Sequence, residues 1–179
     1  EIFGSSADTF SIMNNADLKF PVVKNDEGED VQLTHGVYGQ LLESTNRNVR
    51  EQAFKSLYSV YHQFRNTFAS TLSTHVKGHN YKAKIRGYGS AREAALSGNH
   101  IPEDVYETLT LVVNQYLPLL HRYVELRKEL LGLDELHMYD LYTPLLAEAP
   151  VKFSYEEAQA KALEALKPLG EEYLEVVKK

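Results

Sequence analysis

Two histidines, His75 and His79, stand four residues apart in a stretch whose apolar spacing is typical of a helix. At that spacing both side chains share one helix face, as the two zinc ligands of an HExxH helix do. In that motif the residue after the first His is a Glu that acts as general base, but here the position is Val76. Gly78 also weakens the helix that would hold the pair. We therefore predict no catalytic zinc at this pair, and favour packing or surface histidines over a weak metal site.

Other catalytic arrangements are incomplete in the sequence. No Ser has a context that ties it to a particular His and Asp, as a nucleophile would need. Gly87 and Gly89 lack the preceding strand, the following helix and the spacing of a phosphate-binding loop. The residues alone thus indicate no catalytic residue and no metal ligand.

A second group of chemically capable side chains lies near residue 140. His137, Tyr139, Asp140 and Tyr142 belong to a run rich in β-forming aromatic residues, which predicts an isolated short strand. An exposed strand edge can bind an extended peptide through its main chain. Two interpretations of these residues stay open: they are buried in the structure, or they line a binding cleft. They are the candidate substrate-binding residues of this chain.

The composition excludes several classes of protein. The chain has no Cys, so neither a disulfide nor thiolate chemistry is possible. A net charge of −6 argues against nucleic-acid binding, which needs a basic surface. No apolar run approaches the roughly 18 residues that a membrane span needs. Hydrophobic residues at 43% and charged residues at 25% are ordinary values for a globular protein.

Apolar periodicity predicts a mainly α fold. Its clearest element is one continuous helix over residues 46–86, about 40 residues and therefore about 60 Å long. Such a helix is longer than a small domain, so we expect further protein to support it. Its apolar residues recur every three or four positions along one stripe, which comprises Ala53, Leu57, Tyr61, Phe64, Phe68, Leu72 and Val76.

Shorter elements are expected on both sides of this helix. Two β-leaning runs around the connector 25–29 predict a small hairpin, with Pro21 confining the first strand to an edge. Capping boxes that begin at Ser90 and Ser154 predict two helix starts, and Pro118 should kink the helix that contains it. The other expected helices cover residues 2–16, 35–43, 102–131 and 154–167, with a last helix after residue 170.

Several phrases of the sequence, taken in order, resemble those of one family. The phrases are Phe3–Ser6 with Thr9–Phe10, Asn14–Leu18, His35–Tyr38, Glu43–Arg50, Tyr58–Tyr61 and Leu133–Asp140. They resemble bacterial oligoendopeptidase F, in the family of thimet-like zinc oligopeptidases, and they span essentially the whole chain.

That resemblance implies a cytoplasmic, almost wholly helical peptidase whose deep channel admits short unstructured peptides. It also implies a zinc held by the two His of an HExxH helix and by a later Glu. No HExxH occurs between Glu1 and Lys179, so the zinc-binding part is expected downstream. No catalytic or zinc-binding residue can be carried over. His137, Tyr139, Asp140 and Tyr142 are the candidates for the channel wall.

The chain begins at Glu1 rather than Met and ends in a helical stretch, so we expect a long-helix, multi-helical piece of a larger protein. Residues 1–86 would be the end of an N-terminal helical region and residues 87–179 the beginning of the peptidase domain. Expected partners are short peptides and the missing remainder, with no nucleic acid and no membrane. The alternative is a free-standing helical interaction module that docks through the stripe of residues 53–76.

Overall fold

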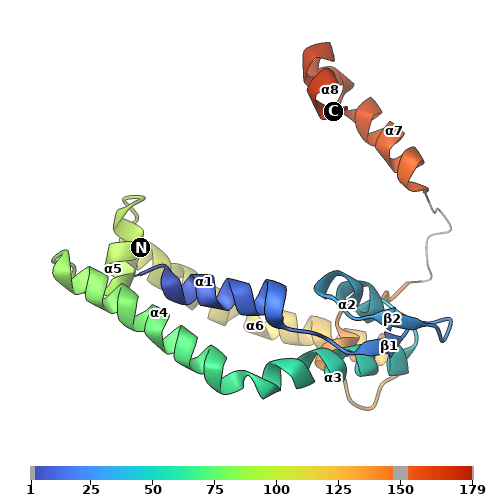
Figure 1. Ribbon diagram of the computed structural model, residues 1–179, viewed down its shortest axis with the longest axis horizontal. Helices are drawn as coiled ribbons and strands as arrows, with labels where there is room; N and C mark the ends of the chain where they lie inside the picture. Colours follow the sequence, from blue (N-terminus) through green and yellow to red (C-terminus); the bar gives the residue numbers. More distant parts are fainter. Residues whose placement is uncertain (1–2, 147–152, 179) are drawn as a thin grey trace. The chain divides into compact units, whose positions relative to one another are not determined.

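A computed structural model describes residues 3–146 and 153–178, so that Ile2 and Lys179 of the predicted helices lie outside the described residues. The chain divides into two compact units, Glu1–Leu145 and Leu146–Lys179, and the predicted division between residues 86 and 87 stays a prediction. The mainly α fold with a small hairpin is confirmed (Figure 1). The elements of the first unit are α1 (Ser5–Ile12), a π-helical turn (Met13–Asp17), β1 (Val22–Lys24), β2 (Asp30–Gln32), α2 (His35–Leu42), α3 (Arg47–Gln63), α4 (Arg65–Ile85), α5 (Ala91–Ser97), α6 (Glu103–Leu130) and a 3-10 turn (Met138–Asp140).

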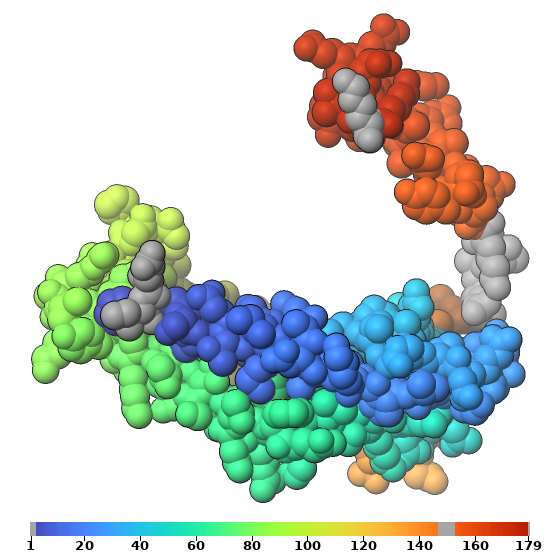
Figure 2. Space-filling view, in the orientation of Figure 1, coloured from blue at the N-terminus to red at the C-terminus, as the bar shows by residue number. Residues whose placement is uncertain are grey.

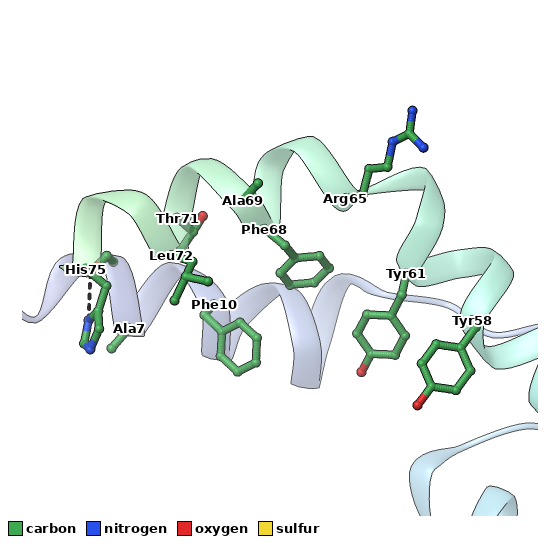
Figure 3. A pocket seen from close by; sticks show the side chains of 11 residues that line it. Ala7, Phe10, Tyr58, Tyr61, Arg65, Phe68, Ala69, Thr71, Leu72 and His75 are labelled. Carbon is green, nitrogen blue, oxygen red and sulfur yellow. Dashed lines mark hydrogen bonds between the residues drawn. The ribbon is translucent and has the colours of Figure 1, made fainter. Parts of the chain in front are cut away.

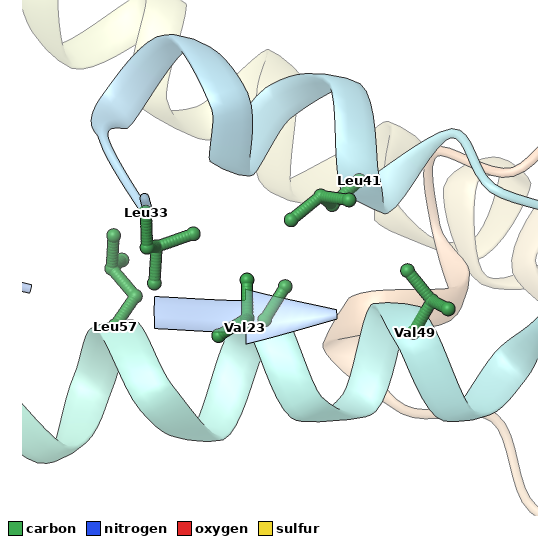
Figure 4. Packing of buried hydrophobic residues seen from close by; sticks show 6 residues of the cluster. Val23, Leu33, Leu41, Val49 and Leu57 are labelled. Atoms are coloured by element: carbon green, nitrogen blue, oxygen red, sulfur yellow. The ribbon is translucent and has the colours of Figure 1, made fainter. Parts of the chain in front are cut away.

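The hairpin and the helices around it form the hydrophobic core of the first unit. Strands β1 and β2 pair antiparallel, with Val23 opposite Val31, and Gly28 supplies the positive φ of 79° that the connecting turn needs. One face of the hairpin packs against α2 and α3. The buried side chains of this cluster are Val23, Leu33, Leu41, Val49, Ala53 and Leu57 (Figure 4).

The long helix predicted over residues 46–86 is wrong in one respect, because α3 ends at Gln63 and α4 begins at Arg65. Phe64 between them has φ −100° and ψ 9°, a turn-like conformation. The break lets the two halves of the apolar stripe pack on different partners. Helix α3 packs on α2 and β1, whereas α4 packs along α1 (Figures 1 and 2).

The isolated strand predicted at residues 137–142 is also wrong, because Met138–Asp140 forms a 3-10 turn. The Asp140 amide donates to the His137 carbonyl at 2.9 Å, and the His137 amide donates to Asp140 Oδ2 at 2.9 Å. Local hydrogen bonds of this kind compete with an extended conformation. They close the segment into a turn.

The second unit contains α7 (Tyr155–Ala165), a 3-10 turn (Lys167–Leu169) and α8 (Glu171–Val177). The capping box at Ser154 is confirmed, with both reciprocal hydrogen bonds to Glu157 present. The helix start at Ser90 is also confirmed, because the Ser90 hydroxyl accepts from the Glu93 amide at 2.9 Å, but the Glu93 carboxylate accepts from the Gly89 amide, at 2.7 Å, instead of the Ser90 amide. Among the described residues, no helix has the length and apolar character that crossing a membrane requires.

Candidate functional site

A single buried carboxylate, that of Asp140, organises the residues that join α3 to the 3-10 turn. Arg50 Nη2 lies 2.7 Å from Asp140 Oδ1, and Arg47 forms a bidentate pair with both carboxylate oxygens at 3.2 and 3.0 Å. Asp140 is fully buried and the Arg50 side chain is 3% exposed, whereas that of Arg47 is 38% exposed. The Arg50 ion pair is therefore shielded from water, and the Arg47 pair is at the margin.

The charge of Asp140 is held by hydrogen bonds that outweigh its burial. Burial alone raises the pKa of a carboxyl group. Hydrogen bonds from Arg47, from Arg50 and from the His137 amide lower it further than burial raises it, so the pKa of Asp140 lies below its usual value. The carboxylate is consequently ionised at neutral pH, as the adjacent guanidinium groups require.

The arginines also hold main-chain carbonyl groups from distant parts of the chain. Arg50 donates to the carbonyls of Ser44 at 2.8 Å and Tyr139 at 3.1 Å. From the C-terminal end of α6, Arg127 donates to the carbonyls of Asp140 at 3.1 Å and Thr143 at 2.7 Å. We call Arg47, Arg50, Arg127 and Asp140 the Asp140 cluster. It ties α3, α6 and residues 135–143 together.

The predicted substrate-binding residues are divided between interior and surface. Asp140 and Tyr139, the latter 6% exposed, are buried. His137 is exposed and stacks on the Tyr139 ring with 5.0 Å between centroids, and Tyr142 is 64% exposed. Only His137 and Tyr142 therefore offer an accessible side chain, and whether they contact a peptide stays a prediction.

An apolar cleft of about 720 Å³ lies between α1 and the second half of the stripe (Figure 3). Phe10 and Phe68 meet edge to face across it, with 5.7 Å between ring centroids. At its other end the Tyr61 hydroxyl donates to Asn14 Oδ1 at 2.6 Å, and burial raises the pKa of Tyr61. The lining residues are Ser6, Ala7, Phe10, Tyr58, Tyr61, Arg65, Phe68, Ala69, Thr71, Leu72 and His75.

The apolar periodicity of the sequence predicted the side of this cleft that is formed by α3 and α4. It did not predict the side that is formed by α1. The stripe residues Tyr61, Phe68 and Leu72 stand on the face expected to be apolar. Phe10 is the opposing side chain, and no local spacing in the sequence indicates that it faces Phe68. Such a pocket, with apolar walls and few polar groups, is typical of a site for an apolar side chain.

A catalytic zinc does not fit the residues that the structure describes. Within residues 3–146 and 153–178, no three His, Asp or Glu side chains gather in a group that could hold a metal ion. A catalytic zinc site needs three protein ligands. No step of a reaction can therefore be assigned to these residues through a zinc ion.

Comparison with known proteins places the chain in a class of peptidases. The family model of peptidase family M3 matches residues 40–178, and the chain belongs to this family. It is 53% identical to oligopeptidase PepF of Bacillus subtilis over 178 residues, which cover 99% of this chain and 27% of that protein. It is 54% identical to an oligoendopeptidase F homolog of Lactococcus lactis subsp. lactis, with 99% and 30% covered.

A solved structure gives the same result for the fold. The crystal structure of oligoendopeptidase-F from Enterococcus faecium is 69% identical, with a TM-score of 0.81, and 98% of this chain matches 33% of that one. The resemblance to oligoendopeptidase F seen in the sequence is thus confirmed. The chain spans about a third or less of the length of these relatives.

Proposed function

We propose that this chain is a non-catalytic segment of a zinc metalloendopeptidase that hydrolyses short oligopeptides. The observation that carries the proposal is the match of almost the whole chain, at 53 to 54% identity, to proteins named oligopeptidase or oligoendopeptidase. The segment itself supplies scaffold. The zinc belongs to the whole enzyme and is held by residues other than those described, since these contain no suitable group of ligands.

Of the four candidate residues, His137 and Tyr142 are proposed to contact the peptide directly. Tyr139 and Asp140 are proposed to act indirectly, through the backbone of the turn. The Asp140 cluster fixes the backbone on either side of Tyr139 and Asp140. That rigid turn presents His137 and Tyr142, whose side chains are accessible, as part of the channel wall. Short unstructured peptides and the remainder of the peptidase are the proposed partners. The cytoplasmic location implied by the resemblance stays a prediction.

A chimera tests this proposal directly. Residues 1–179 would replace the matching segment of the Enterococcus faecium enzyme, which is 69% identical. We expect the chimera to cleave a short fluorogenic peptide at a rate close to that of the parent, with activity lost on addition of a chelator. The purified 179-residue chain alone should cleave nothing. A folded but inactive chimera, or chelator-sensitive cleavage by the chain alone, would contradict the proposal.

The wall residues are tested in the same chimera. His137→Ala and Tyr142→Ala should raise KM several-fold with little change in kcat, because contacts made equally in the ground state and the transition state act on KM. Asp134→Ala, at a nearby exposed position, serves as the control. Unchanged KM for both variants would restrict the segment to a scaffold. Tight binding of an unrelated protein through the stripe of residues 53–76 would instead favour the interaction module.

A further inference from the structure

The structure brings together the two histidines that the sequence singled out. His75 Nε2 and His79 Nε2 lie 3.0 Å apart on one face of α4, with 4.5 Å between their rings. His75 is half-buried and His79 is exposed. Two imidazole nitrogens therefore lie close together at the protein surface.

That separation matches the one that a bound metal ion imposes. Imidazole nitrogens bind zinc at about 2.0 to 2.1 Å, and coordination angles between 90° and 109° put two such nitrogens roughly 2.9 to 3.4 Å apart. The two Nε2 atoms already lie at this distance. In the absence of metal, one imidazole N–H donates to the other nitrogen, so the pair is already oriented.

A second contact, with Ser6, fits the tautomer of His75 that metal binding needs. Ser6 Oγ, on α1, lies 3.3 Å from His75 Nδ1 (Figure 3), and Ser6 is only 8% exposed. When Nδ1–H donates to this hydroxyl, Nε2 keeps its lone pair for a metal. Histidine ligands in metal sites are usually fixed by such a hydrogen bond from their other ring nitrogen.

We propose that His75 and His79 form a two-imidazole site for a late first-row divalent cation, of the class of Cu²⁺, Ni²⁺ and Zn²⁺. Imidazole suits these ions, whereas Mg²⁺ and Ca²⁺ prefer oxygen ligands. Water completes the coordination. On binding, His79 moves its proton from Nε2 to Nδ1, so that both Nε2 atoms face the ion. The proposal does not rest on the proposed peptidase function.

Calorimetry on the untagged 179-residue chain tests the site. NiCl₂ or ZnCl₂ is titrated at pH 7.5 in a buffer that does not bind metals. We expect one site per chain, and His79→Ala should weaken the affinity at least tenfold, because one of two ligands is lost. The matched control is His121→Ala, an exposed histidine of α6, which should leave the affinity unchanged within twofold.

Two further measurements distinguish a specific metal site from adventitious metal binding. Ser6→Ala keeps both ligands and should weaken binding several-fold, as loss of an orienting partner does. Electron paramagnetic resonance of the Cu²⁺ complex should show coupling to two imidazole nitrogens in the parent chain and to one in His79→Ala. Equal affinity of the parent and His79→Ala, or no binding at millimolar metal, overturns the proposal. Peptidase activity is not measured, so these outcomes are independent of the proposed function.

Discussion

Replacing Asp140 with Asn is the sharpest test of the structural role of the Asp140 cluster. The change keeps the size of the side chain but removes the carboxylate charge that pairs with Arg50, whose side chain is 3% exposed. A guanidinium group cannot shed its proton to avoid this burial. Breaking a buried ion pair by removing one partner costs about 3 to 5 kcal/mol. Arg47 adds little, because its side chain is 38% exposed and water screens it.

Such a loss is a large part of the stability of a domain, which totals about 5 to 15 kcal/mol. With a urea dependence of about 2 kcal/mol per molar, the unfolding midpoint should fall by roughly 2 M. Circular dichroism during urea titration at pH 7 measures the change. Asp134→Asn, an exposed Asp shortly before the 3-10 turn, is the control for loss of one negative charge. A midpoint for Asp140→Asn within about 0.5 M of that control would refute the assigned role.

The other predictions concern pH, the core, a helix position and association. The pKa of Asp140 is lowered in the folded chain, so its carboxylate stabilises the fold at any pH above the ordinary carboxyl pKa of about 3.9. That stabilisation is lost as the pH falls through the lowered pKa of the folded state. The stability gap between the parent chain and Asp140→Asn in urea should therefore shrink below about pH 4. Leu57→Ala, at a position 4% exposed, should cost about 3 kcal/mol in urea unfolding; a cost under about 1 kcal/mol would contradict the assigned core. Gly78→Ala should stabilise by about 0.5 to 1 kcal/mol, because Ala has the higher helix propensity and the added Cβ would meet Phe3 Cδ1 at 3.4 Å without a clash; destabilisation would show that the Phe3 side chain cannot accommodate it. The exposed apolar residues of α6 should make the chain self-associate, and sedimentation as a monomer over a wide concentration range would count against this.

Local patterns in the sequence were sufficient to predict most helices. The stripe that begins at Ala53 and Leu57 identified the buried face of α3, and both side chains lie in the core. The capping box at Ser154 identified the start of α7. The break at Phe64 could not be predicted, because neither Gly nor Pro marks it. Beyond the break, Phe68 packs on Phe10 of α1, and this contact joins residues far apart in the chain.

The environment of Asp140 was outside the reach of sequence reasoning for the same kind of reason. Its aromatic neighbours suggested an exposed strand, but its carboxylate pairs with Arg47 and Arg50, about ninety residues earlier in the chain. Such a pairing leaves no periodic signal in the sequence. The residue types near position 140 indicated a candidate functional segment. The choice between binding a ligand and holding the backbone depended on which distant cations reach the carboxylate.

Helix α6 carries many apolar side chains that the core of the first unit does not bury. Leu111, Val112 and Val113 are consecutive and therefore point in directions about 100° apart, yet they are 65, 39 and 52% exposed. Exposed apolar side chains over so wide an arc of a helix are typical of a surface that further protein covers. Its C-terminal end is fixed by Arg127 to residues 140 and 143, while most of its large apolar side chains remain exposed. This apolar surface is therefore available to further protein, and the Asp140 cluster fixes the end of the helix that presents it.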